Sequence, residues 1–525
     1  MPGRPRARCT VAARVRRGGG RGMAARYVTE LVEAFERYAG RPAIGGGAAL
    51  LTFSEALDEV HRLAGALAEA GAGRGTGLAC VVAGNRPELL LVRLAAHLLG
   101  ARLTMVVGGP SAYGLEFLLQ DCRPGLVVHD MPVPETGVPR LALAELVARA
   151  AVRDPVPVPV RAREDDVARV TYTSGTTGLP KGVASTFGAM AARSVDRPEA
   201  AGAVHLSVTS LAERAGGRCL EQLRAGGRVE VLESFDPPEF AAACRRLAPV
   251  STYLMASMVY RLLDHPATAD GVPGLRAVSY GASPIDPGRL REAVTRWGGR
   301  WRQGYGMNEA AVICRLSPAD HDAAVRDRPG LLASVGRPAP GVEVQVRDAD
   351  GVRVLPAGST GEVWTRSAAM MSGYWNQPAL TAGVLRGGWL RTGDLGRLDA
   401  AGYLYLVDRV KDVVMVDGDN VYCLPVEAAL TGHPAVAEAA VVGRHSDLTG
   451  EEVCAFLVPA PGYEPGDRVA AEACDRVVAA LAPYHRPTAV FWERELPLTS
   501  RGKPDKRLLR QWAATRSGRP TPGGR

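Results

Sequence analysis

A stretch rich in glycine and hydroxyl groups, VTYTSGTTGLPKGV from Val170 to Val183, offers the clearest chemistry in the chain. The β-branched and aromatic run at 170–173 predicts a strand, which opens into a loop that ends near Lys181. Glycines let the loop turn its amides inward, hydroxyls add donors, and the lysine adds a positive charge, so the loop can form a nest for a polyphosphate. The Walker pattern differs, because its lysine stands beside a Ser or Thr at a helix start. A polar surface loop with a chance lysine is the alternative, but so many donors close together favour phosphate binding.

A second glycine-rich string, QGYGMNE at 303–309, follows a predicted strand and holds an aromatic residue and a carboxylate. Tyr305 lies between two glycines, which let the backbone approach closely, so its ring can lie flat against a purine. Glu309 lies just past the strand, where magnesium bound to phosphates would take an oxygen ligand. Taken alone, Tyr305 would be a core aromatic and Glu309 an acid at a helix start. Beside the loop at 173–182, both are better explained as binding residues.

Three later strings hold further candidates. In GWLRTGDLG, at 388–396, Asp394 is held between glycines and can accept two hydrogen bonds from ribose hydroxyls. The charged run DRVKD at 408–412 separates two regions of different periodicity. In PLTSRGKPD, at 497–505, Lys503 lies on a loop bounded by glycine. Each would be ordinary alone, as a turn-forming acid, a solvated turn and a solvated lysine.

Together and in this order, the five strings resemble the motifs of the adenylate-forming superfamily, and within it the AMP-dependent acyl-CoA synthetase and ligase family. The match runs from about residue 27 to residue 510. It implies that the chain activates an acid with ATP, forming acyl-AMP and pyrophosphate, and then transfers the acyl group to a thiol, that of CoA in the first place. ATP, Mg²⁺ and CoA are the implied cofactors. Such a reaction needs charge stabilisation on phosphoryl oxygens more than a covalent nucleophile.

The resemblance also implies individual roles. Lys503, Glu309, Lys181 and Thr177 would be catalytic, and Glu309 with Thr177 would hold the metal. Lys503 would contact the attacking carboxylate and the α-phosphate, and Lys411 would be the hinge that rotates the C-terminal domain between half-reactions. The implied ATP- and AMP-binding residues are Thr173, Ser174, Gly175, Thr176, Gly178, Gly281, Ala282, Ser283, Gln303, Gly304, Tyr305, Gly306, Asn308, Asp394 and Arg409. Asn308 departs from the family pattern, which has threonine there.

The acid pocket implied by the resemblance includes Glu213, Gly217, Tyr280 and Val312. Family members usually have a histidine or an aromatic residue where Glu213 stands. A carboxylate about 4 Å from the substrate carboxylate would cost roughly 4 kcal/mol at an effective dielectric constant near 20. Glu213 could be protonated, could pair with Arg214 or Arg218, or could bind a cation on the substrate. We therefore predict a polar, amino-bearing or aryl acid in preference to a plain long-chain fatty acid.

Other functions stay open on the sequence. A separate phosphopantetheinyl carrier protein could be the thiol partner, or the enzyme could adenylate nitrite and deliver it to an aryl amine. A catalytically dead nucleotide-binding regulator is disfavoured by the joint presence of Lys181, Glu309, Asp394, Arg409 and Lys503. We therefore expect a ligase of secondary metabolism with a small-molecule acid as its substrate.

The elements that must position these residues follow an α/β rhythm. Residues 53–67 predict a helix capped by Thr52 or Ser54, residues 77–82 a buried parallel strand, and residues 87–99 the next helix. The fold class expected is α/β, with a large N-terminal domain of parallel sheets sandwiched by helices and a β-rich subdomain, followed by a small α+β C-terminal domain. The expected boundaries are a disordered basic leader at 1–25, the N-terminal domain at 26–407, a hinge at 408–412, the C-terminal domain at 413–515 and a disordered tail at 516–525.

Composition excludes some classes of protein. Of the net charge of +8, seven units come from arginines before Met23, a stretch without an acid, so the rest of the chain is close to neutral. That balance disfavours a nucleic-acid enzyme. An upstream start codon, with Met23 as the true beginning, explains the leader best; a basic arm or a transit-like segment is the alternative. The nine cysteines lack metal-ligand spacing, and no apolar run could span a membrane, so we predict a cytoplasmic protein.

Overall fold

The first large sheet is mostly parallel, and one of its strands ends at Thr173, where the sequence predicted to bind phosphate begins. The computed structural model describes residues 23–47, 49–107, 112–173, 180–193, 204–417, 419–446, 448–499, 503–516 and 519–520. The sheet has the order β18-β8-β7-β4-β3-β5-β6, in which β8 and β18 run antiparallel to their neighbours. Its strands are β3 (Gly77–Val82), β4 (Arg102–Val107), β5 (Leu126–His129), β6 (Arg140–Ala142), β7 (Val167–Thr173), β8 (Lys181–Thr186) and β18 (Gly373–Tyr374).

A second sheet has the order β15-β14-β13-β12-β11-β9-β10-β1-β2 and is parallel from β13 to β1. Its strands are β1 (Pro42–Gly46), β2 (Ala49–Thr52), β9 (Val204–Ser207), β10 (Arg228–Val231), β11 (Val250–Leu254), β12 (Leu275–Gly281), β13 (Arg300–Met307), β14 (Ala311–Leu316) and β15 (Arg337–Pro338). The carboxyl ends of β12 and β13 carry the turns that the sequence singled out.

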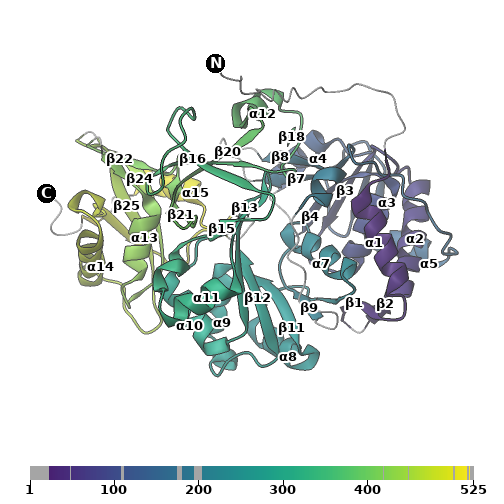
Figure 1. The fold of residues 1–525 in the computed structure, drawn as a ribbon, viewed down its shortest axis with the longest axis horizontal. Helices are drawn as coiled ribbons and strands as arrows, with labels where there is room; N and C mark the ends of the chain where they lie inside the picture. The colour runs from purple at the N-terminus through teal and green to yellow at the C-terminus, as the bar shows by residue number, and fades with distance from the viewer. Residues whose placement is uncertain are drawn as a thin grey trace, which may run out of the picture.

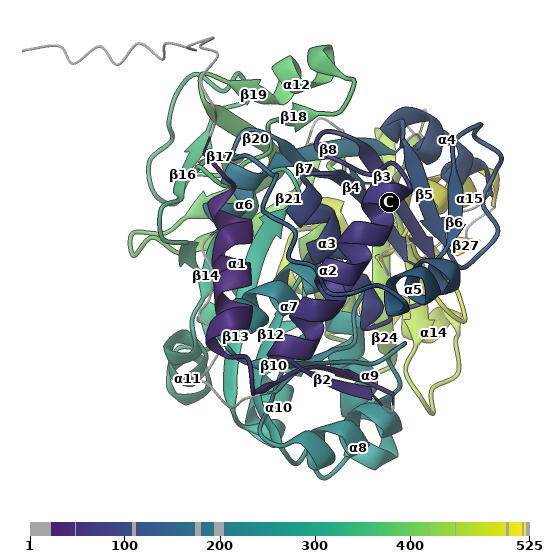
Figure 2. The ribbon, with the colours of Figure 1, turned by 90° about the vertical axis from the view of Figure 1, so that its right-hand side faces the viewer.

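A layer of helices separates the two sheets. These helices are α1 (Arg26–Arg37), α2 (Phe53–Glu69), α3 (Glu88–Leu99), α5 (Leu143–Ala151), α6 (Phe187–Ala191) and α7 (Arg214–Arg224). Figure 2 shows α1, α2 and α7 in the middle, with strands of the first sheet above and of the second below. One core joins Cys80 of β3 to Val229 of β10 through this layer. Thr52 caps α2 in a capping box with Glu55, as one of the two predicted caps.

The outer faces are covered as well. Alternate residues of β3, such as Ala79 and Val81, face α4 (Ala112–Cys122), while Cys80 faces the middle layer. The outer face of the second sheet packs on α8 (Pro237–Leu247), α9 (Ala256–Asp264), α10 (Pro287–Trp297) and α11 (Pro318–Arg326). Both sheets are therefore buried on two sides, which explains the continuous apolar runs in their strands.

A third, antiparallel sheet leads to the C-terminal domain. It contains β16 (Glu343–Arg347), β17 (Gly361–Arg366), β19 (Leu385–Arg386), β20 (Trp389–Leu398) and β21 (Leu404–Arg409). The C-terminal domain lies at the left of Figure 1. Its elements are β22 (Val414–Val416), β23 (Asp419–Val421), α13 (Cys423–Thr431), β24 (Val436–Ser446), β25 (Gly450–Pro459), α14 (Asp467–Ala480), β26 (Ala489–Trp492), α15 (Lys506–Thr515) and β27 (Arg519–Pro520). The predicted fold class is confirmed.

Two predicted boundaries differ from the structure. Ala25 is fully buried and Ala24 pairs with Arg163, so these residues of the expected leader belong to the N-terminal domain. Arg519 and Pro520 pair with β26, although the tail from 516 was expected to be disordered. Neither contact could be predicted from the local sequence, because the two partners are distant in the chain. None of the helices in the described ranges combines the length and the apolar character that crossing a bilayer requires.

Candidate active site

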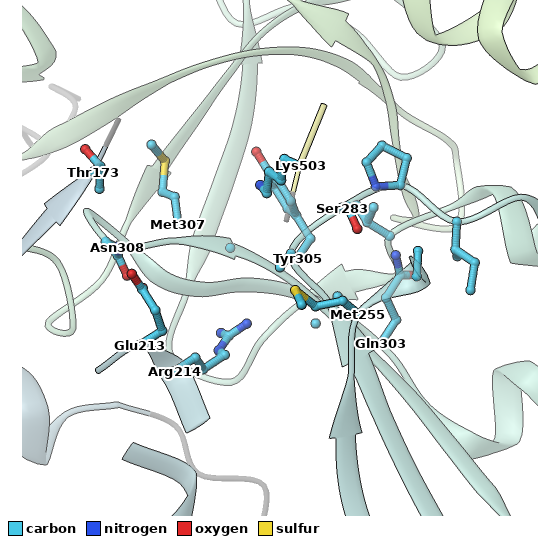
Figure 3. Close-up of a pocket in the computed structure, with 18 of the residues that line it drawn as sticks. Thr173, Glu213, Arg214, Met255, Ser283, Gln303, Tyr305, Met307, Asn308 and Lys503 are labelled. Carbon is cyan, nitrogen blue, oxygen red and sulfur yellow. The ribbon is translucent and has the colours of Figure 1, made fainter. Parts of the chain in front are cut away.

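Most of the predicted site residues that the structure describes line one cleft of about 2630 Å³. It lies where the ends of β7, β12 and β13 meet the third sheet and the C-terminal domain. Figure 3 shows side chains from these elements pointing into the space between the ribbons. A cleft of this size can hold a nucleotide and an organic acid together.

Tyr305, Asp394 and Arg409 form a hydrogen-bonded group on one wall of the cleft. The Tyr305 hydroxyl donates to Asp394 Oδ2 at 2.5 Å, and Arg409 Nε donates to Asp394 Oδ1 at 2.9 Å. The antiparallel ladder of β20 and β21 sets Asp394 opposite Arg409. Burial, and then the nearby Asp394 charge, raise the pKa of Tyr305 far above its usual value, so the phenol stays a neutral donor. An aromatic ring beside a fixed carboxylate suits a purine nucleoside.

Lys181, Glu309 and Tyr374 form a second group. Glu309 is 7% exposed, and its Oε1 accepts a hydrogen bond of 3.1 Å from the Tyr374 hydroxyl. Lys181 Nζ lies 5.7 Å from the centroid of the Tyr374 ring, within the range of a cation–π contact. Tyr374 was not among the residues predicted from the sequence, although it follows a glycine in the string SGYWN at 372–376. Its strand, β18, pairs with β8, so only the sheet order brings it beside Lys181.

Lys503 enters the same cleft from the C-terminal domain. It lies in a short loop closed by a bridge between Leu498 and Pro504, in which the Thr499 amide donates to the Lys503 carbonyl at 2.7 Å. Figure 3 shows the Lys503 side chain in the cleft with Tyr305 and Ser283. Lys411, the predicted hinge residue, also lines the cleft, just after the end of β21.

At two positions another part of the backbone comes so close that only glycine fits. A Cβ at Gly281 would collide with the carbonyl oxygen of Gly304, and one at Gly306 with that of Ala311. Thr173, Ala282, Ser283 and Asn308 also line the cleft. Gln303 is 8% exposed, and its Oε1 has no hydrogen-bond partner among the described residues, so a ligand donor could satisfy it. Ser174, Gly175, Thr176, Thr177 and Gly178 lie outside the described residues.

The predicted acid pocket is found in part. Glu213, Gly217 and Val312 line the cleft, and a Cβ at Gly217 would meet open space. Arg214 lies against Gly304, because its Nη1 is 3.7 Å from where a Cβ on that glycine would be. Figure 3 shows Glu213 and Arg214 entering the cleft from the start of α7.

Tyr280 does not line the cleft, contrary to the prediction. It is 1% exposed, its hydroxyl pairs with His321 Nε2 at 2.8 Å, and its ring packs against Trp301. Residues alternate along β12, so Ser279 and Gly281 face the cleft while Tyr280 faces the outer helices.

Glu213 interacts electrostatically with Arg169, which is not one of its neighbours in the sequence. Its negative charge opposes the lowering of the pKa of Arg169, which burial and neighbouring arginines cause. Arg169 therefore supplies a positive charge that interacts with Glu213, so an amine on the substrate is not required to balance this carboxylate.

Comparisons with known proteins agree with this geometry. The sequence model described as AMP-binding enzyme matches residues 31–375, and the one described as AMP-binding enzyme C-terminal domain matches residues 425–503. The chain is 34% identical to the medium/long-chain-fatty-acid–CoA ligase FadD8 of Mycobacterium tuberculosis over 91% of this chain and 89% of that one. It is 35% identical to the fatty acid–[acyl-carrier-protein] ligase ScoC of Streptomyces coeruleorubidus, over 76% and 77%.

Among solved structures, the amide bond synthetase McbA from Marinactinospora thermotolerans superposes with a TM-score of 0.81 at 33% identity. The superposition covers 94% of this chain and 100% of that chain. The likeness therefore includes both domains of the structure described here.

Proposed function

Because the chain belongs to the AMP-binding enzyme family, whose members form adenylates from ATP, we propose that it is an AMP-forming acid–CoA ligase. It converts an acid and ATP to acyl-AMP and pyrophosphate, and then transfers the acyl group to the thiol of CoA. The observation that carries this proposal is that the Tyr305–Asp394–Arg409 group and Lys503 line one cleft. We place the reaction in the cytoplasm, where ATP and CoA are supplied.

For the first half-reaction, we assign the residues by what their atoms can contact. Asp394 can accept from the ribose hydroxyls while Arg409 and Tyr305 hold its carboxylate in place. Lys181, at the end of the strand pair with Thr173, can neutralise charge on the phosphate tail. Lys503 can stabilise the charge that develops at the α-phosphate as the acid oxygen attacks.

Glu309 fits a magnesium ion that is held mainly by phosphates. The Tyr374 hydroxyl donates to Glu309 Oε1, so the second carboxylate oxygen of Glu309 can serve as the metal ligand. The described residues contain no cluster of three or more His, Cys, Asp or Glu that could hold a metal alone. A single carboxylate with phosphate oxygens is typical of Mg²⁺ bound to ATP, where the ion neutralises the charge of the phosphates.

For the second half-reaction, we propose that rotation at Lys411 withdraws Lys503 and admits the thiol. The acid is polar or aryl, because the pocket wall formed by Glu213, Arg214 and Gly217 offers charge and open space. A carrier protein is the second candidate for the thiol partner, and the similarity to ScoC supports it.

Pyrophosphate release is the experiment that tests the proposed function. The purified chain is incubated with ATP, Mg²⁺ and a panel of fatty, aryl and amino-aryl acids, amino acids and nitrite, each with and without CoA. We expect release that depends on an acid, with the matching CoA thioester in the mass spectrum. The proposal would be contradicted if nitrite were the only compound that triggered release, or if none of the acids on the panel did so. Adenylate that accumulates with CoA but reacts with a phosphopantetheinylated carrier protein would favour the second candidate.

A further inference from the structure

Three arginines from separate parts of the chain, two of them buried and one partly exposed, line the end of the cleft that reaches into the middle helical layer. Arg93 on α3 is 2% exposed, Arg169 on β7 is 8% exposed, and Arg193 follows α6. Tyr27 of α1 and Glu221 of α7 line the same end of the cavity. We call Arg93, Arg169 and Arg193 the arginine cluster.

The cluster holds donors without acceptors. In the part of the chain that the structure describes, Nε and Nη2 of Arg93, Nε of Arg169 and Nε of Arg193 are buried and have no hydrogen-bond partner. Arg193 does use its Nη2, which donates to Ser185 Oγ at 3.1 Å. Buried charged donors are rarely left unpaired in proteins, because their desolvation is costly. Unpaired donors facing a cavity therefore point to an acceptor that the ligand supplies.

Positive charge is in excess at this end of the cleft. Burial, and then Arg193 and Arg93, lower the pKa of Arg169 well below its usual value, and burial followed by Arg93 lowers that of Arg193 to about 10. The nearby carboxylates do not balance the cluster. Glu221 is paired with Arg224 at 2.8 Å, and Glu213 is a single charge beside Arg169.

The cluster is separate from the phosphate end of the cleft. Arg169, Thr171 and Thr173 all line the cleft from one face of β7, and Thr173 pairs with Lys181 at the start of the phosphate-type loop. Four residues of strand place Arg169 about 13 Å from Thr173. Arg214, whose charge also acts on Arg193, lies between the cluster and Gly304. The cationic lining thus runs inward from the site where the acid is activated.

We propose that the activated acid carries a second anionic group, a carboxylate or a similar oxyanion, which the arginine cluster binds while the first carboxylate is adenylated. This inference rests on the proposed function and names its class of substrate. A plain fatty acid would place methylene groups against unpaired guanidinium groups and leave their donors unsatisfied. An anion on the substrate satisfies those donors with charge-assisted hydrogen bonds.

Matched pairs of acids test the proposal. Pyrophosphate release is measured for octanoate against octanedioate, and for 3-phenylpropanoate against 3-(4-carboxyphenyl)propanoate. The expected result is a kcat/KM at least ~10-fold higher for one diacid than for its monoacid. In Arg93→Met, Arg169→Met and Arg193→Met we expect this ratio to fall by ~10- to 100-fold, because a charged partner is lost. Arg93→Lys should retain part of the ratio.

The control variant is Arg276→Met, an exposed arginine on β12, which should keep the wild-type ratio. Thermal unfolding measured with the diacid alone gives a readout that does not depend on turnover: the diacid should raise the Tm of the wild type but not that of the cluster variants. This proposal alone would be overturned if monoacids reacted and no diacid were preferred. It would also be overturned if the three variants left the ratio of diacid to monoacid kcat/KM unchanged. Silence with every acid would overturn the proposed function as well.

Discussion

Glu309, the proposed metal ligand, is oriented by one hydrogen bond. The carboxylate is almost fully buried, and the Tyr374 hydroxyl holds one of its oxygens at 3.1 Å. Burial, and then the Glu309 charge, raise the pKa of Tyr374, so the phenol remains a donor at neutral pH. Tyr374 acts through Glu309 and is therefore a positioning residue.

Tyr374→Phe should weaken the response to magnesium more than it weakens binding of the acid. We expect the Mg²⁺ concentration for half-maximal pyrophosphate release to rise by about 10-fold, the usual cost of losing a partner of a metal ligand. Titration of Mg²⁺ at saturating ATP measures this. Tyr484→Phe, which alters an exposed tyrosine, is the matched control. A purely structural role for Tyr374 would lower Tm and leave the magnesium response unchanged.

Lys503→Ala separates the two half-reactions. We expect acid-dependent pyrophosphate release to fall by about 100- to 1000-fold, the range seen when one donor to a developing charge is removed. Thioester formation from supplied acyl-adenylate and CoA should fall by less than 10-fold, since that step does not use the lysine. Equal losses in both half-reactions would contradict the assignment.

At the scale of elements, the proposed hinge is tied to α15. Asp412 pairs with Arg510 of α15 at 2.5 Å, and Lys506 at the start of that helix pairs with Glu427 of α13 at 2.7 Å. Asp408, at the end of β21, accepts hydrogen bonds from the amides of Arg409 and Cys423. Of these contacts, the hydrogen bond from the Cys423 amide to Asp408 crosses the proposed hinge and joins β21 to the start of α13, in the domain that carries Lys503.

Asp408 should make the stability of the chain depend on pH. Burial raises the pKa of its carboxyl from 3.8 to about 6, so the folded chain binds this proton more tightly than the unfolded chain does. The stabilisation from this group is complete below pH 3.8 and is lost as the pH rises through 6. Such a shift corresponds to about 3 kcal/mol.

Asp408→Asn removes this linkage. From pH 4.5 to pH 7, the free energy of unfolding of wild type should fall by about 2 kcal/mol more than that of the variant, because only wild type carries the titrating carboxyl. Urea unfolding at the two pH values measures the change, and Asp350→Asn, on an exposed turn, is the control. Parallel pH profiles for Asp408→Asn and wild type would show that the carboxyl has an ordinary pKa.

At the scale of the whole molecule, three sheets and the C-terminal domain meet around one cleft. The first sheet contributes Lys181 and Arg169, the second Tyr305, and the third Asp394. No single domain contains the complete arrangement, so its chemistry depends on how the domains are placed. That dependence suits an enzyme whose two half-reactions need two arrangements of the same parts.

Deletion of residues 1–22 should leave this arrangement intact. The deleted stretch holds seven arginines and no acid, whereas the rest of the chain is near neutral. We expect kcat, KM and Tm to equal those of the full chain, because none of the assigned site residues lies in the deleted segment. A drop in activity larger than twofold would assign the leader a role in the enzyme.

Much of the fold and of the nucleotide side of the site was predictable from the sequence. Buried parallel strands have continuous apolar sequences, and glycine-rich turns follow at their ends. Short stretches of sequence therefore indicate the order of the elements. Tyr305, Asp394 and Lys503 stood out because each lies in a string of unusual spacing. Tyr374 was missed because its significance comes from a partner strand.

By itself, the sequence determined the α/β class and the order of the motifs, because these depend on residues that are neighbours in the chain, and the resemblance of those motifs to a known family implied the type of reaction. The tertiary structure decided that Tyr280 faces the core, since the register of β12 sets which residues reach the cleft. It also brought Arg93, Arg169 and Arg193 together from three elements. Charge that several elements contribute cannot be recognised from local spacing, and for that reason the proposal of a second anionic group on the acid rests on the tertiary structure.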